Sequence, residues 1–339
     1  MGCQKELECS RILQRQPAFC RCYNQMHYGG YSSVAERRSV AADVVGSNPT
    51  SRPNLLQVDP LAPYSASSIE SALPRSSPSQ PALAFGNPTG PSAPAHIFAG
   101  TSGWAYASWK PGFYPAGVSS KRFLEYYATR LNSVEVNFTF RKLPTESMLT
   151  VWLSAVPAGF QFSFKAPQRI THFNRLRTCE GLVTDFVASV RPAQEAGKLG
   201  LLLFQLPPNF KASPHILTDF LSIPALNGPS SPRIAFEFRD TSWFSEEVYT
   251  LLREHNAALC VAETDDLRTP DVHCARTHAS FRLRRAGGYS SEDVRRLAEN
   301  LAPLAADRDV YIYFKHEDDP AGALNAVEFL AESSRVAQS

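Results

Sequence analysis

The stretch Arg233-Ile-Ala-Phe-Glu-Phe-Arg-Asp-Thr-Ser-Trp243 begins as an apolar strand and ends in charged residues. Side chains alternate across a β-strand, so Glu237 and Arg239 share one face while Phe236 and Phe238 share the other. An acid and a base therefore project into the same space at the carboxyl end of this strand. On this stretch alone, an internal ion pair explains the pattern as well as a functional site does.

The same pattern, an apolar strand that ends in polar side chains, recurs along the chain. The repeats are Ser133–Asn137, Phe160–Lys165, Leu201–Gln205, Leu259–Glu263, Phe281–Arg284 and Val310–Lys315. Their polar ends include Glu135, Asn137, Lys165, Gln205, Glu263, Arg282, Arg284 and Lys315. With the opening stretch Arg233–Trp243 and with Ile97–Thr101, these six segments make eight predicted strands. Helical patterns follow most of them, at residues 121–131, 145–155, 182–196, 245–255, 291–302 and 322–331.

Strands that alternate with helices predict a parallel sheet of the α/β class. Eight such units within about 250 residues fit a TIM-type (β/α)8 barrel better than an open doubly wound sheet. No G-x-G-x-x-G follows the first predicted strand, so the dinucleotide-binding fingerprint of the open sheet is missing. In a barrel the polar strand ends would meet at the C-terminal mouth, where such folds place their active sites.

Composition narrows the class of protein. The chain has 339 residues, 43% of them hydrophobic, as in an ordinary globular core. No run approaches the roughly 18 apolar residues of a membrane span, and no signal peptide opens the chain, so we expect a cytoplasmic protein. Residues 1–95 hold 8 of the 34 Lys and Arg and 6 of the 32 Asp and Glu, so residues 96–339 carry 26 of each sign. This balance argues against an extended nucleic-acid footprint.

The first 95 residues are predicted to be a disordered extension outside the fold. Residues 47–95 hold ten prolines and ten serines and lack apolar periodicity. Upstream, Ser32-Ser-Val-Ala-Glu-Arg37 and Gly46-Ser-Asn-Pro49 resemble the translated D-arm and T-arm of a tRNA gene. We therefore expect a spurious extension at 1–95, a true start between about Arg52 and Ala95, and one barrel domain over 96–335.

Several motifs together resemble those of the YecE-like family, a domain of unknown function. The opening motif is Gly100-Thr-Ser-Gly-Trp-x-Tyr-x-x-Trp109 with Phe113-Tyr-Pro115. The others are Asn132-Ser-Val-Glu-Val-Asn-Phe-Thr-Phe140, Phe164-Lys-Ala-Pro-x-x-Ile-Thr-His172, Leu203-Phe-Gln-Leu-Pro-Pro208, Phe236-Glu-Phe-Arg-x-x-Ser-Trp243 and Tyr313-Phe-Lys-His-Glu317. They stand in family order over about residues 96–331. The resemblance implies a TIM barrel and a shared polar cluster, but no reaction.

One departure from the family pattern concerns the seventh strand. Many members carry Tyr-x-Arg-x-His-Gly there, whereas this chain reads Phe281-Arg-Leu-Arg-Arg285, with Tyr289-Ser290 following. Arg282 is kept, but Arg284 stands where the family has a histidine. A role carried by that histidine is therefore in question here.

The candidate site is assembled from these strand ends and the loops after them. Charges that converge in a cleft shift one another's pKa values and mark candidate acids and bases. A histidine is suited to proton transfer, and arginine forks suit phosphate or carboxylate. The aromatic loop after the first strand could form part of a lid over the mouth. The candidate catalytic residues are Glu237, Glu135 and His172, and the candidate substrate-binding residues are Lys165, Arg239, Arg282, Gln205, Asn137, Trp104, Tyr106 and Lys315.

The hypothesis that the sequence favours is an enzyme acting on a phosphorylated or carboxylated small molecule by general acid/base chemistry. Two alternatives stay open: a metal-dependent phosphodiester-cleaving enzyme, by analogy of fold alone, and a non-catalytic protein that binds an anionic ligand. Lys315-His-Glu-Asp318 offers potential metal ligands but no H-x-H or H-x-x-x-H spacing. We therefore predict neither a metal site nor a cofactor, and the sequence does not specify an oligomeric state. Cys179, Cys260 and Cys274 are widely separated and imply no disulfide framework.

Overall fold

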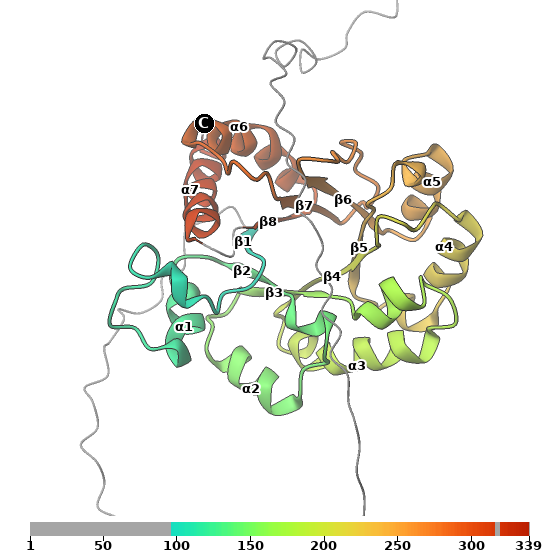
Figure 1. Cartoon of the computed structure of the whole chain (residues 1–339), viewed down its shortest axis with the longest axis horizontal. Helices are drawn as coiled ribbons and strands as arrows, with labels where there is room; N and C mark the ends of the chain where they lie inside the picture. Colours follow the sequence, from blue (N-terminus) through green and yellow to red (C-terminus); the bar gives the residue numbers. More distant parts are fainter. Residues whose placement is uncertain (1–95, 316–318, 339) are drawn as a thin grey trace, which may run out of the picture. The chain divides into compact units, whose positions relative to one another are not determined.

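Eight parallel strands form the centre of the unit that the structure describes. The computed structural model describes residues 96–315 and 319–338. The strands pair in the order β1-β8-β7-β6-β5-β4-β3-β2. Figure 1 shows the strands at the centre of this unit and helices around them. Their bounds are β1 (Ile97–Thr101), β2 (Ser133–Val136), β3 (Gln161–Lys165), β4 (Leu199–Gln205), β5 (Arg233–Glu237), β6 (Ala258–Glu263), β7 (His278–Leu283) and β8 (Asp309–Phe314).

Helices connect most of these strands. They are α1 (Phe123–Tyr127), α2 (Glu146–Ser154), α3 (Glu180–Glu195), α4 (Pro214–Leu221), α5 (Glu246–Glu254), α6 (Ser291–Leu301) and α7 (Ala321–Val336). The (β/α)8 barrel predicted from the repeating strands is confirmed. The sequence patterns missed α4, and the described residues 264–277, between β6 and β7, form no helix. The extension predicted at residues 1–95 lies outside the described residues.

Local sequence sets where several helices begin. Ser290 caps α6: its hydroxyl accepts a hydrogen bond from Asp293 N at 3.2 Å, while the Asp293 carboxylate accepts one from Ser290 N at 3.0 Å. This reciprocal capping box satisfies backbone donors that the first turn leaves without partners. Ser245 caps α5 by accepting from Val248 N at 3.4 Å. None of the helices in the described part of the chain has both the length and the apolar character needed to cross a membrane.

The alternation seen in the sequence separates two cores. Within the barrel, small, aliphatic and aromatic side chains pack together: Leu201, Leu203, Ala235, Ala258, Cys260, Tyr311 and Tyr313. The residues between them face outward and pack under the helices, as Leu202, Phe204, Ile234 and Phe236 do. Parallel strands covered by helices bury both faces, so apolar residues are needed on each. The barrel interior is therefore a packed core, and open space for a ligand can exist only at its ends.

Side chains replace much of the backbone ladder where β1 meets β2. The Asn132 amide accepts from Ala99 N at 2.9 Å and donates to Ile97 O at 2.8 Å. The Tyr127 hydroxyl accepts from Thr101 N and donates to Ser133 O, each at 2.9 Å. These bonds satisfy strand-edge groups that would otherwise be buried without partners.

Gly100 is required at the same seam. A Cβ on Gly100 would lie 1.9 Å from the carbonyl oxygen of Ser133 and 2.7 Å from the Tyr127 hydroxyl. Beyond it, Ser102 pairs with Glu135 as a parallel bridge. The seam thus closes the barrel and brings the end of β1 against β2, which positions the first two polar groups of the mouth.

Candidate functional site

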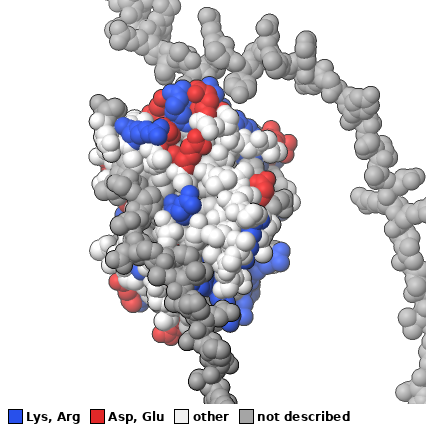
Figure 2. Space-filling view, turned by 90° about the vertical axis from the view of Figure 1, so that its left-hand side faces the viewer, with Lys and Arg blue, Asp and Glu red and all other residues white. Residues whose placement is uncertain are grey.

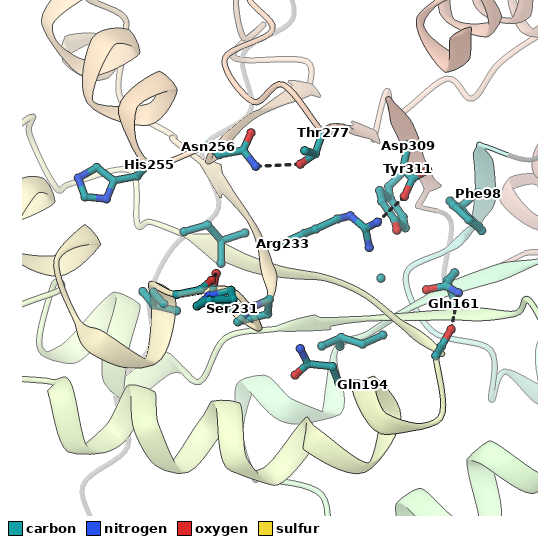
Figure 3. Close-up of a pocket in the computed structure, with 18 residues that line it drawn as sticks. Phe98, Gln161, Gln194, Ser231, Arg233, His255, Asn256, Thr277, Asp309 and Tyr311 are labelled. Atoms are coloured by element: carbon teal, nitrogen blue, oxygen red, sulfur yellow. Dashed lines mark hydrogen bonds and ion pairs between the residues drawn. The ribbon is translucent and has the colours of Figure 1, made fainter. Parts of the chain in front are cut away.

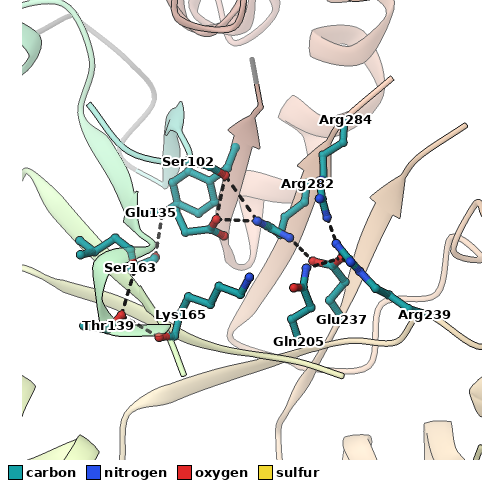
Figure 4. A network of polar contacts seen from close by, with 12 residues as sticks. Ser102, Glu135, Thr139, Ser163, Lys165, Gln205, Glu237, Arg239, Arg282 and Arg284 are labelled. Carbon is teal, nitrogen blue, oxygen red and sulfur yellow. Dashed lines mark hydrogen bonds and ion pairs between the residues drawn. The ribbon is translucent and has the colours of Figure 1, made fainter. Parts of the chain in front are cut away.

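Polar side chains from six strands converge at the carboxyl ends of the barrel strands (Figure 4). The alternation of side chains along each strand explains this convergence, because the inward-facing row of residues ends in a polar side chain. Their hydrogen bonds and ion pairs connect most of them into one network. The mouth network is defined here as Ser102, Glu135, Lys165, Gln205, Glu237, Arg239, Arg282 and Arg284.

Arg282 lies at the centre of the mouth network and bridges two carboxylates. Its Nη2 donates to Glu135 Oε1 at 2.7 Å, and its Nη1 donates to Glu237 Oε2. Arg282 is 2% exposed, and both glutamates are fully buried. Burial by itself would lower the pKa of Arg282, but Glu135 and Glu237 raise that pKa above its usual range. Arg282 therefore stays charged and joins β2 to β5 across the mouth.

Glu237 collects four donors. Besides Arg282, its Oε1 accepts from Gln205 Nε2 at 2.8 Å, Arg239 Nε at 3.0 Å and Arg284 Nη1 at 3.1 Å. Burial would raise the pKa of Glu237, but the three guanidinium groups hold this pKa well below its usual range. A carboxylate held in this way binds protons weakly, so it is better suited to position arginines than to accept a proton.

The Glu135 carboxylate accepts fewer hydrogen bonds than the Glu237 carboxylate. Its Oε1 accepts from the Ser102 hydroxyl at 2.8 Å as well as from Arg282. Its Oε2 is buried and has no hydrogen-bond partner among the described residues, and the same holds for Nε of Arg282 and of Arg284. Buried polar atoms in proteins are nearly always hydrogen-bonded, so these atoms have capacity to bind a polar ligand.

Lys165, at the end of β3, points its ammonium group toward the same centre (Figure 4). Its Nζ lies 4.2 Å from the centroid of the Phe140 ring. No hydrogen bond or ion pair joins Nζ to another described residue, although Arg282 and Glu135 are close enough to affect its charge. Burial lowers the pKa of Lys165 to about 8, and Arg282 adds to this effect while the two glutamates oppose it.

His172 lies on the π-helical turn Arg169–Phe173 that follows β3. Its ring stacks edge-on against Phe140 at 5.0 Å, and Nδ1 is 2.9 Å from the Thr171 hydroxyl. Burial lowers the pKa of His172, and Lys165 and Arg239 lower it further. The imidazole is therefore neutral near pH 7 and can both donate and accept a hydrogen bond.

A cavity of about 620 Å³ opens beside the network. Glu237, Arg239, Arg284 and Lys315 line it, together with the loop after β6. This volume falls in the range of small-molecule sites. Asp265 and Asp266 line the cavity as well, so its charge is mixed, and its basic groups include Arg239 and Arg284 of the mouth network.

The aromatic loop after β1 divides between the rim and the core. Trp104 packs edge-on against Trp152, with 5.3 Å between ring centroids. The Tyr106 hydroxyl donates to Ser102 O at 2.8 Å, and its ring contacts Trp109, which is fully buried. Asn137 follows β2, and its Oδ1 is buried without a partner among the described residues. A ligand role for Trp104, Tyr106 and Asn137 stays a prediction.

One residue expected at the mouth lies elsewhere. Cys260 faces the barrel interior, so Val261 and Glu263 on the same strand face outward. The Glu263 carboxylate accepts a hydrogen bond from the Tyr289 hydroxyl at 3.1 Å instead of joining the network. The expectation that Glu263 contributes to the mouth was therefore wrong. Alternation shows that Glu263 and Val261 share a face of β6, but it does not show which face points into the barrel.

Two contributors were missed from the sequence. Ser102 bonds Glu135, and Phe140 lies under the Lys165 ammonium group. Ser102 had the same signal as the other residues, a polar side chain directly after a strand. Phe140 carried no such signal, since an aromatic residue after β2 is indistinguishable from a core residue in sequence.

A second cavity, of about 600 Å³, lies at the opposite, N-terminal end of the strands. Figure 3 shows Arg233, Asp309 and Tyr311 on its wall. Arg233 Nη2 pairs with Asp309 Oδ2 at 2.7 Å. In TIM barrels this end serves stability and the C-terminal end carries activity, so the mouth network is the better candidate site.

The described residues contain no group of three or more His, Cys, Asp or Glu side chains arranged to hold a metal ion. The acidic segment at residues 316–318, considered above for metal ligands, lies outside them. The three cysteines within the barrel domain, Cys179, Cys260 and Cys274, are buried free thiols.

Solved structures of other proteins share this fold. A DUF72 family protein from Thermotoga maritima MSB8 superposes with a TM-score of 0.61 at 26% identity, covering 72% of this chain and 99% of that protein. A DUF72 family protein from Enterococcus faecalis V583 superposes with a TM-score of 0.58 at 19% identity, which supports the fold alone.

Curated relatives match parts of the chain. UPF0759 protein YecE of Escherichia coli (strain K12) is 34% identical over 114 residues, which make up 34% of this chain and 39% of YecE. UPF0759 protein YunF of Bacillus subtilis (strain 168) is 28% identical over 157 residues, 45% of this chain and 54% of YunF. The matched stretches thus span about half or less of these relatives.

The family model described as "Protein of unknown function DUF72" matches residues 98–338, nearly all of the barrel. The resemblance to YecE-like proteins inferred from the motifs is confirmed. This chain therefore belongs to the DUF72 family.

Proposed function

We propose that this protein is an enzyme that binds a small phosphorylated or carboxylated molecule at the barrel mouth and acts on it by acid/base chemistry. The observation that carries the proposal is an excess of positive charge. The mouth network holds two carboxylates, Glu135 and Glu237, and four cationic side chains, Lys165, Arg239, Arg282 and Arg284. With all six ionised, their net charge is +2, which an anionic ligand would offset.

The anion is proposed to bind between the network and the cavity. Arg239 and Arg284 contribute to both, and each uses one guanidinium nitrogen on Glu237. Other N–H groups of each fork therefore stay available, and a guanidinium suits the paired oxygens of phosphate or carboxylate. Lys315 lines the same cavity and would add a further positive charge.

Proton transfer is proposed for Glu135 and His172. Glu135 keeps one oxygen without a protein partner among the described residues, and His172 is neutral near pH 7. Glu237, predicted from the sequence to be an acid or base, is proposed instead to orient Arg239, Arg282 and Arg284. Three guanidinium groups around one carboxylate make its protonation costly.

The balance of 26 basic and 26 acidic residues over 96–339 supports a small ligand over an extended nucleic acid. Figure 2 shows basic and acidic side chains interspersed near the top of one face, with uncharged residues over much of the rest. A further group of basic side chains lies at the lower right of this face. Nucleic-acid binding depends on many phosphate contacts, so a confined basic site fits a compact anion better.

The test is anion binding followed by a search for turnover. Thermal unfolding is measured with inorganic phosphate and with a panel of phosphorylated and carboxylated metabolites. We expect several to raise the Tm of the wild type and to lose that effect in Arg239→Ala and Arg284→Ala. Arg295→Ala, on the exposed face of α6, is the control and should respond like the wild type.

Each result then separates the hypotheses. Chemical change of a binding metabolite, lost in Glu135→Gln while binding remains, supports the enzyme. Tight binding without turnover by any member of the panel favours the non-catalytic binding protein. Equal stabilisation of the wild type and both arginine variants would place the anion elsewhere and contradict the proposal.

A further inference from the structure

We propose that Lys165 is the nucleophile of this site, and that its amino group condenses with the aldehyde or ketone carbonyl of a small anionic substrate to form an imine. This inference rests on the proposed function, since the anion-binding arginines would hold the substrate. It adds the reacting atom and the chemical class of the substrate: a carbonyl compound that carries a phosphate or carboxylate.

The position of Lys165 carries the inference. It is the inward residue at the end of β3, and Figure 4 shows its amino group directed into the mouth toward Arg282 on β7, with Glu135 on the neighbouring strand β2. Lysines that serve structure normally end on an acceptor, as Lys198 does by donating to Leu153 O at 2.7 Å and Val156 O at 2.9 Å. Among the described residues, Lys165 Nζ has no such acceptor and lies over the face of Phe140.

The surroundings favour the neutral amine, which is the nucleophilic form. Burial is the largest effect, and the guanidinium groups of Arg282 and Arg239 add to it, while Glu135 and Glu237 oppose it. Desolvation together with a neighbouring cation is a known way to activate an amine. With a pKa of about 8, about one lysine in ten is neutral at pH 7, whereas an ordinary lysine is neutral about once in several thousand.

The reaction balances without an added oxidant or reductant. The lone pair of neutral Nζ attacks the carbonyl carbon, a C–N bond forms, and the carbonyl oxygen takes up a proton to give a carbinolamine. The C–O bond then breaks, and the oxygen leaves as water with both hydrogens that the amine has lost. The product is the neutral imine, and its protonation gives an electron-withdrawing iminium.

Neighbouring groups fit this sequence of proton transfers. Lys165 is close enough to lower the pKa of His172, so a neutral imidazole is available to accept the proton that the amine loses and then, as imidazolium, to donate it to the departing oxygen. The free Oε2 of Glu135 is available to take a proton from the carbon next to the iminium. Arg239 and Arg284 would hold the anionic group on the cavity side.

The test is reductive trapping on the full-length protein. Wild-type protein is incubated with glyoxylate or glyceraldehyde 3-phosphate in the presence of cyanoborohydride, which reduces an imine to a stable secondary amine. Peptide mapping by mass spectrometry then locates the adduct. We expect Lys165 to be labelled at least tenfold faster than Lys198 and the exposed Lys211, with a rate that rises with pH to a plateau above about 8.

Variants and a second probe complete the experiment. Lys165→Arg keeps the charge but forms no such imine, so the fast phase should vanish while Lys198→Arg retains it. The uncharged aldehyde propanal should lose most of the preference for Lys165. Because the adduct is mapped on the wild type, the conclusion does not depend on the folding of a variant.

The outcomes distinguish this inference from the proposed function. If Lys165 is labelled no faster than Lys211, the proposal of an imine at Lys165 is wrong. The proposed anion site is still supported in that case if phosphate raises the Tm and this effect depends on Arg239. Fast labelling of Lys165 by propanal and glyoxylate alike would support the nucleophile but contradict its anionic substrate class. If the wild type shows neither preferential trapping at Lys165 nor anion binding, both proposals are wrong.

Discussion

Arg282 and Glu237 form a buried ion pair between β7 and β5, although β6 lies between these strands. Both residues are at most 2% exposed, and Arg282 pairs at the same time with Glu135 on β2. The pair therefore joins distant parts of the barrel wall through its mouth.

Arg282→Met should destabilise the protein by about 3–5 kcal/mol, because removing one partner of a buried ion pair leaves uncompensated charge. Here two carboxylates, Glu135 and Glu237, would lose their shared cation. Urea unfolding measures the change in free energy of unfolding. Arg295→Met, whose ion pairs on α6 are half exposed, is the control and should change stability by less than about 1 kcal/mol. Equal effects of the two variants would show that the mouth network adds little to stability.

Glu237→Gln should reduce stability at neutral pH and make less difference in acid. Folding lowers the pKa of Glu237 from its ordinary 4.5, so its contribution is complete above that pH and declines as pH falls below it. The free-energy difference between wild type and variant should thus stay constant from pH 6 to 8 and shrink below about 4.5. Glu247→Gln on the exposed side of α5 is the control, with an expected change within about 0.5 kcal/mol. A difference that grows in acid would contradict this sign.

Lys165→Met should raise stability at pH 7, on the order of 1–2 kcal/mol, because folding disfavours the charged form of this lysine. The pKa falls from 10.5 to about 8 on folding, so the wild type regains stability as pH rises from about 8 toward 10.5. The gap between wild type and variant should close over that range in urea unfolding at several pH values. Lys121→Met, at an exposed position, should show no comparable trend. A variant less stable than the wild type at pH 7 would indicate that the ammonium group is stabilised in the fold.

Gly100→Ala should destabilise the barrel by about 3 kcal/mol or more, because its Cβ would lie 1.9 Å from the backbone oxygen of Ser133 at the β1–β2 seam. Gly181→Ala is the matched control. Gly181 lies in the first turn of α3 with nothing within 4 Å of the added Cβ, so alanine should stabilise by about 0.5–1 kcal/mol. Thermal unfolding of both variants gives the comparison. Tolerance of alanine at both positions would contradict the tight seam.

Sequence patterns predicted most of the architecture, because a period of two along a strand states which residues share a face. The same rule places Glu135, Glu237 and Arg282 in one site from the sequence alone. The rule failed where the sequence did not show which face of a strand points inward, or where a segment was too short to show a helical period. For Glu263, the sequence did not show that Cys260 is the inward residue of β6. For α4, eight residues that begin at Pro214 are too short for a clear helical period.

The sequence by itself determined the parallel α/β barrel, the family and the polar character of the strand ends, since these follow from local periodicity and from motifs. Only the tertiary structure decided which charges pair. Four donors gather on Glu237, whereas Lys165 is left above Phe140 without a partner in the described part of the chain. The physical reason is that a pKa depends on burial and on distances between side chains of different strands, and those distances exist only once the barrel has closed.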